Sequence, residues 1–143
     1  MRIKILSFFS LALLCASVSC YIFSLIVPAF GCHYFGADSF QFTIEPGYMI
    51  LLMGWLGVSV LNFAWIANLT YVITLILVMT NHLKWAYYFS VATLLIGLSG
   101  LLIYFDKANL QVGLYLGFYL WIGSFVLLVI CAALNKIFWE SLN

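Results

Sequence analysis

Four long apolar runs, almost free of charged side chains, account for most of this 143-residue chain. They cover residues 5–30, 48–79, 85–105 and 110–135. A helix needs about 20 apolar residues to cross the roughly 30 Å hydrocarbon core of a bilayer, and each run reaches that length. The runs therefore predict an all-α integral membrane bundle of about four transmembrane helices, forming a single transmembrane domain over residues 1–143.

Composition supports lipid as the main solvent of the chain. Hydrophobic residues make up 67% and charged residues 6%, whereas soluble domains average about half and a quarter. A soluble core of this length could not hide so much apolar surface, so we expect the lipid bilayer as a partner. Five basic and four acidic residues are scattered along the chain, giving a net charge of +1. Without a basic patch, nucleic acid is not expected as a partner.

The first run resembles a secretory signal at its start, because Arg2 and Lys4 precede the apolar stretch. It continues to Phe30, beyond the length of a signal peptide core, so we expect an anchor helix that is retained. Pro28 and Gly31 mark its end. The polar, aromatic-rich residues 31–47 are then expected as a loop at the membrane surface.

The second run, residues 48–79, is too long for one straight crossing. Its 32 residues would extend about 48 Å as a helix. Either one long helix tilts and kinks near Asn62 to Asn68, or two short pieces turn at Ala67 and Asn68 as a re-entrant hairpin. We expect the single kinked crossing.

The distribution of basic residues predicts the orientation, because Lys and Arg in short loops remain on the cytoplasmic side. Five crossings would leave only a weak bias, whereas four separate the basic residues clearly. Four place all but Lys107 on one side, namely Arg2, Lys4, Lys84 and Lys136. Both termini are therefore expected in the cytoplasm, with loop 31–47 outside.

Small and amide side chains within the runs suggest close helix packing. Gly113 and Gly117 form a GxxxG pattern, which lets another backbone approach one helix face, either within the bundle or between copies in a homo-oligomer. Asn62 and Asn68 lie at expected membrane depth, where an amide must find a partner. We expect them to join helices; the alternative is that they line a polar path.

Residues that normally carry catalysis are absent from the confident runs. None contains Asp, Glu, Lys, Arg or His, which argues against ion-coupled transport. His33 and His82 fall in expected loops, so paired haem ligands are not predicted. The four cysteines contain no CxxC pair, which disfavours thiol exchange; they are Cys15, Cys20, Cys32 and Cys131. We expect no enzyme active site, no cofactor and no metal.

The outer loop is the candidate recognition surface. It combines aromatic, acidic, thiol and imidazole side chains; the candidates are Cys32, His33, Tyr34, Phe35, Asp38 and Glu45. With no catalytic set to argue for an enzyme, we expect a non-enzymatic accessory, assembly or immunity-type partner of another membrane protein. The alternative is a small oligomeric channel or uncoupled transporter, with Asn62 and Asn68 along its path.

Two short motifs carry a resemblance. Gly54-Trp55-Leu56-Gly57 is followed by Ala64-Trp65-Ile66-Ala67-Asn68. This pattern resembles small bacterial multi-pass inner-membrane proteins that have no assigned activity, and it implies a bacterial inner-membrane location. In those proteins a proline often follows the asparagine and would kink the helix. Here the position is Leu69, so no proline enforces a kink.

Overall fold

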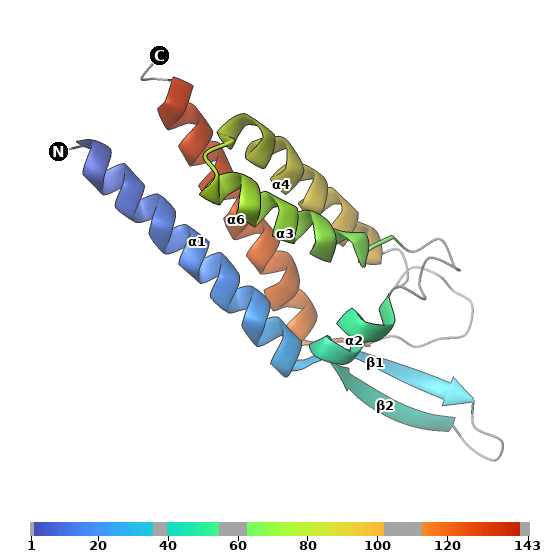
Figure 1. Ribbon diagram of the computed structural model, residues 1–143. Helices are drawn as coiled ribbons and strands as arrows, with labels where there is room; N and C mark the ends of the chain where they lie inside the picture. Colours follow the sequence, from blue (N-terminus) through green and yellow to red (C-terminus); the bar gives the residue numbers. More distant parts are fainter. Residues whose placement is uncertain (1, 36–39, 55–62, 102–112, 141–143) are drawn as a thin grey trace.

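The computed structural model describes residues 2–35, 40–54, 63–101 and 113–140, which are mostly helical with a small sheet at one end (Figure 1). The helices are α1 (Arg2–Ile26), α2 (Gly47–Met53), α3 (Ile66–Met79), α4 (Leu83–Leu98) and α6 (Leu116–Glu140). A 3₁₀ turn, Ser99–Leu101, follows α4. The strands are β1 (Pro28–Phe35), β2 (Phe40–Pro46) and β3 (Gly113–Leu114).

The four longer helices form an up-and-down bundle. α1 packs along α6, α6 along α4, and α4 along α3. α1 begins and α6 ends at the end of the bundle opposite the sheet (Figure 1). Among the described residues, two helical segments are long and apolar enough to cross a membrane, Phe8–Ile26 and Leu116–Trp139.

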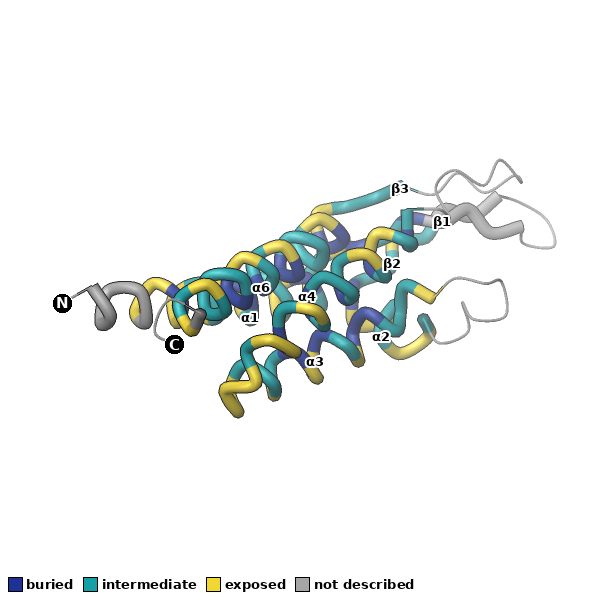
Figure 2. Tube along the Cα trace, turned by 90° about the horizontal axis from the view of Figure 1, so that it is seen from above, coloured by how far each residue is buried: buried dark blue, intermediate teal, exposed yellow. Residues whose placement is uncertain are grey.

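The polarity of the bundle is inverted relative to a soluble protein. Buried positions hold many hydroxyls, including Ser10, Ser17 and Ser24 at seven-residue spacing on one face of α1. Many positions along the helices are exposed (Figure 2), and large apolar side chains occupy many of these positions. The apolar core cluster is small and consists of Ala67, Tyr71, Phe125 and Leu128. Among the described residues, large apolar side chains thus lie on the outer surface of the bundle more often than in its interior.

The second apolar run does not form the long kinked helix expected over 48–79. α2 ends at Met53 and α3 begins only at Ile66, so the helix is interrupted at residues 63–65, inside the stretch where a kink was expected. Ala67 and Asn68 lie within α3, so the alternative turn does not lie at those two residues. The Trp65 indole donates a hydrogen bond of 2.7 Å to the Leu51 carbonyl, which ties the end of α2 to the start of α3. Residues 55–62, and Asn62 with them, lie outside the described residues.

The expected loop over 31–47 is wrong for most of its described residues, because they form a hairpin. β1 and β2 pair antiparallel from Pro28 opposite Pro46 to Phe35 opposite Phe40. β3 extends the sheet on the other side, with Gly113 opposite Gly31. In β2, apolar and polar residues alternate over 40–44, the period of a strand. The interspersed aromatics were interpreted as interfacial anchors, and that period was overlooked.

Candidate functional site

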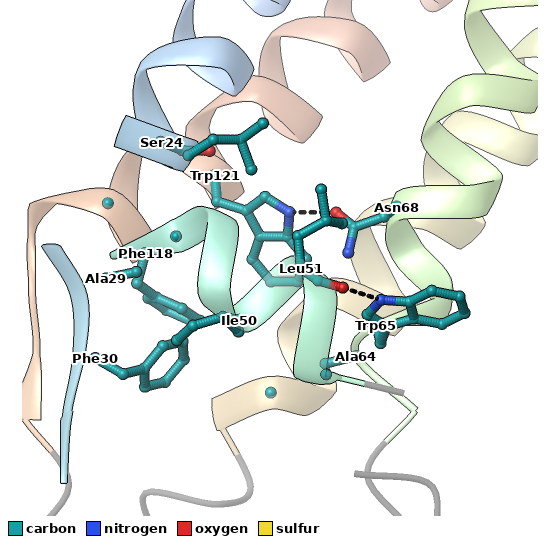
Figure 3. Close-up of a pocket in the computed structure, with 15 residues that line it drawn as sticks. Ser24, Ala29, Phe30, Ile50, Leu51, Ala64, Trp65, Asn68, Phe118 and Trp121 are labelled. Atoms are coloured by element: carbon teal, nitrogen blue, oxygen red, sulfur yellow. Dashed lines mark hydrogen bonds between the residues drawn. The ribbon is translucent and has the colours of Figure 1, made fainter. Parts of the chain in front are cut away.

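A cavity of about 170 Å³ lies at the sheet end of the bundle (Figure 3). Its wall is assembled from the end of α1, the start of β1, α2, the start of α3, the 3₁₀ turn and the first turns of α6. Aromatic and aliphatic side chains dominate the lining, including Phe30, Leu51, Phe118 and Trp121. None of the described residues that line it is ionisable. The cavity is therefore suited to uncharged, mainly apolar groups.

Glycines allow the segments around the cavity to approach one another. A Cβ at Gly47 would overlap the backbone of Ser24, and the Gly47 amide donates a 3.2 Å hydrogen bond to the Val27 carbonyl. A Cβ at Gly117 would lie 2.8 Å from the Pro28 carbonyl oxygen and 2.9 Å from that of Val27. The α1–β1 junction is thus held between α2 and α6 by backbone contacts that only glycine permits.

Asn68 forms the polar floor of the cavity and is only 8% exposed. Its Oδ1 accepts two hydrogen bonds, at 3.0 Å from the Tyr21 hydroxyl and 2.8 Å from the Trp121 indole. Because both donors meet the same oxygen, they fix which way the amide faces. The Nδ2 group is then turned toward the cavity (Figure 3).

A second set of contacts closes the bundle beneath Asn68. The rings of Tyr21 and Tyr71 stack with centroids 4.5 Å apart and an interplanar angle of 9°. Ser17 donates its only hydroxyl proton to the Ser124 carbonyl at 2.8 Å, so the Tyr71 hydroxyl is the donor in the 2.9 Å bond to Ser17. These contacts join α1, α3 and α6.

The candidate packing residues occupy different settings. Gly113 lies in β3 and Gly117 in the first turn of α6, so the pair does not form the helical GxxxG face that the sequence suggested. Gly117 does permit a close approach, but to the α1–β1 junction within the same chain. Asn68 bonds to side chains of α1 and α6.

The candidate recognition residues are spread over the hairpin. Four of them follow one another along β1, namely Cys32, His33, Tyr34 and Phe35. Glu45 lies on β2 opposite Phe30 and is half-buried. Asp38 lies outside the described residues. In the part of the chain that the structure describes, no group of three or more His, Cys, Asp or Glu side chains could hold a metal.

Sequence reasoning did not predict the cavity. Of its residues, only Asn68 had been singled out for its chemistry, as an amide that needed a partner. The glycines that line it come from three separate segments: Gly47 and Gly54 from the two ends of α2, Gly100 from the 3₁₀ turn and Gly117 from α6. Nothing in their local sequence indicates that they share one wall.

Comparison with protein-family models, curated proteins and solved structures finds no match to this chain. The arguments that follow therefore rest on the residues and their geometry.

Proposed function

We propose that the chain is a four-span integral membrane protein. The support is that each of the four longer helices exposes large apolar side chains on its outer surface. Each of these helices has a large apolar side chain that is more than half exposed: Phe23 on α1, Ile76 on α3, Leu95 on α4 and Ile137 on α6. Monomeric soluble proteins rarely expose such continuous apolar surface, whereas lipid solvates it without cost.

The same proposal explains the polar interior. Buried hydroxyls donate to carbonyls of the preceding helical turn, as Thr74 does to Thr70 at 2.7 Å and Thr93 to Phe89 at 2.8 Å. Hydrogen bonding and small-residue packing hold helices together in lipid, where the hydrophobic effect between helices is weak. At the end opposite the sheet, the Lys136 ammonium lies 4.7 Å from the centre of the Tyr87 ring. A cation and aromatic rings at this end fit the expected cytoplasmic face of a bacterial inner membrane.

Thiol labelling tests this arrangement. We expect a membrane-impermeant maleimide to label an Ile44→Cys variant in spheroplasts, a Thr80→Cys variant only after permeabilisation, and Cys15 under neither condition. Cys15 is exposed in the protein, but in a lipid-facing helix a water-soluble maleimide would not reach it. Peptide mass spectrometry after labelling identifies each site, and unfolding in dodecyl sulfate gives the full extent of labelling. Rapid labelling of Cys15 in intact membranes would contradict a lipid-facing α1.

Within this membrane protein, we propose a binding role: an accessory, assembly or immunity-type partner of another membrane protein. The observation that carries it is the sheet, which projects beyond the helices at the expected outer end (Figure 1). Its strand order is β2-β1-β3, so β2 is an edge strand whose second side has no partner strand among the residues that the structure describes. Unpaired backbone groups on an edge accept a strand from another chain. The occupant we propose is an extended segment of a membrane partner.

The Ile44→Lys variant tests the edge. Ile44 is 48% exposed in the middle of β2, and we expect its replacement by lysine to weaken partner retention at least tenfold. Desolvating an unpaired ammonium in an interface costs more than the about 1.4 kcal/mol that a factor of ten requires. The readout is quantitative mass spectrometry of what co-purifies from mild detergent, with the native mass of the complex.

Met79→Lys is the matched control, because Met79 is 76% exposed at the other end of the bundle. Its partner retention should equal that of the unsubstituted protein. Equal retention in the Ile44→Lys variant would refute docking on β2. A homo-oligomer without any heterologous partner would refute the accessory role itself.

The contacts around Asn68 disfavour the channel alternative. The Asn68 carbonyl is occupied by Tyr21 and Trp121, and the stacked tyrosines fill the core directly below. A polar path along Asn68 through one copy of the chain would have to open this network.

A further inference from the structure

One polar group in the cavity wall has no protein partner. Asn68 Nδ2 carries two N–H donors, and no acceptor for either lies among the described residues, although the residue is 8% exposed. The two hydrogen bonds to Oδ1 prevent the amide from turning over to satisfy them. The donor faces the cavity, so a ligand that accepts from it there gains a hydrogen bond in apolar surroundings.

The other polar groups of the wall are already engaged. Ser24 donates to the Tyr21 carbonyl at 2.6 Å, and the Trp65 indole donates to the Leu51 carbonyl at 2.7 Å. The Trp121 indole donates its hydrogen bond to Asn68 Oδ1. Among the side chains lining the cavity, donation to a ligand therefore falls to Asn68 Nδ2.

Size and charge restrict the ligand further. An apolar cavity of about 150 Å³ holds one benzene-sized molecule, and this cavity has about 170 Å³. Its lining has no side chain to neutralise an ion, and an ion would lose its hydration without compensation. A pure hydrocarbon would fit but would leave the amide unpaired.

We propose that this cavity binds an uncharged molecule, or an uncharged group of one, about the size of a six-membered ring, whose carbonyl-type oxygen accepts a hydrogen bond from Asn68 Nδ2. Phe30, Phe118 and Trp121 supply the apolar contacts. Because the amide is held before binding, little freedom is lost when the ligand arrives. This site is separate from the β2 edge, so its test does not depend on the partner proposed above.

Tryptophan resonances provide the experiment. The protein is placed in lipid nanodiscs with its indole nitrogens labelled with ¹⁵N, and cyclohexanone is titrated as the probe. Trp65 and Trp121 line the cavity, and we expect their resonances to shift and saturate. Trp85 and Trp139 are exposed near the opposite end of the bundle, so they report only the non-saturating effect of probe dissolved in the bilayer.

Methylenecyclohexane is the matched probe, because it replaces the carbonyl oxygen by a CH₂ group of similar shape. We expect about fivefold weaker binding at equal concentration in the bilayer, the usual effect of one neutral hydrogen bond. An Ala64→Leu variant fills the cavity and should abolish the saturable shift, whereas Gly123→Ala, whose new methyl meets nothing within 4 Å, should preserve it. Unchanged Trp85 and Trp139 resonances show that a variant is folded.

Two outcomes would overturn the proposal. Equal affinity for both probes means that Asn68 Nδ2 does not contact the ligand. The absence of any saturable shift at Trp65 and Trp121 in the unsubstituted protein means that the cavity binds no molecule of this class.

Discussion

Replacing Gly117 by alanine should destabilise the protein by about 3 kcal/mol, the upper part of the range for forcing extra atoms into a packed interior. The added methyl would lie 2.8 to 3.0 Å from the carbonyl oxygens of Val27 and Pro28 and from Cα of Ala29. All three are backbone atoms, so no side-chain rotation can relieve the overlap. α6 would have to move away from the α1–β1 junction.

Gly123→Ala is the control on the same helix. A Cβ there meets nothing within 4 Å, and alanine favours the helix by up to about 1 kcal/mol over glycine. We expect unchanged or slightly higher stability. Reversible unfolding in mixed dodecyl sulfate and dodecyl maltoside micelles, followed by tryptophan fluorescence, measures both variants. If the two glycines tolerate alanine equally, the junction is not packed as described.

Replacing Asn68 by leucine should cost about 2 to 3 kcal/mol of unfolding free energy. Leucine has the same branching at Cγ, but it leaves the Tyr21 hydroxyl and the Trp121 indole without an acceptor. Each unpaired buried donor costs about 1 to 3 kcal/mol. A single interhelical hydrogen bond in a membrane contributes near the low end of this range. For the two donors together we therefore expect the cost of about 2 to 3 kcal/mol given above. The same mixed-micelle unfolding measures it.

A double-mutant cycle separates hydrogen bonding from packing. Tyr21→Phe alone should cost about 1 kcal/mol, because it removes one donor to Asn68. In the Asn68→Leu background the same change should instead restore about 1 kcal/mol, since it removes a buried donor that has been left without an acceptor. Simple additivity of the two changes would mean that Tyr21 and Asn68 are not coupled. Thr80→Val, at an exposed position, should change stability by less than about 0.5 kcal/mol.

The hairpin and the second apolar run show where sequence reasoning loses accuracy. The alternation over residues 40–44 is a local signal for a strand, but its aromatic residues also fit a membrane interface, and the second interpretation prevailed. For residues 48–79, hydropathy measures only the length of an apolar run. The contact of Trp65 with the Leu51 carbonyl, which helps set where α2 and α3 meet, leaves no trace in hydropathy.

The candidate site, too, could be predicted from the sequence only in part. That Asn68 needed a partner followed from its chemistry alone, because an amide in apolar surroundings cannot remain unpaired. Its partners, Tyr21 and Trp121, lie 47 and 53 residues away in sequence. With one sequence, no rule of spacing connects them.

By itself, the sequence determined the predominance of apolar helices and the absence of charged side chains from the apolar runs 5–30, 48–79, 85–105 and 110–135, because the composition and period of each segment are local properties. The tertiary structure decided which glycines become contact points, which way the Asn68 amide faces, and that a cavity lies above it. Those features arise where segments distant in sequence pack together, and close packing depends on the shapes of both surfaces at once.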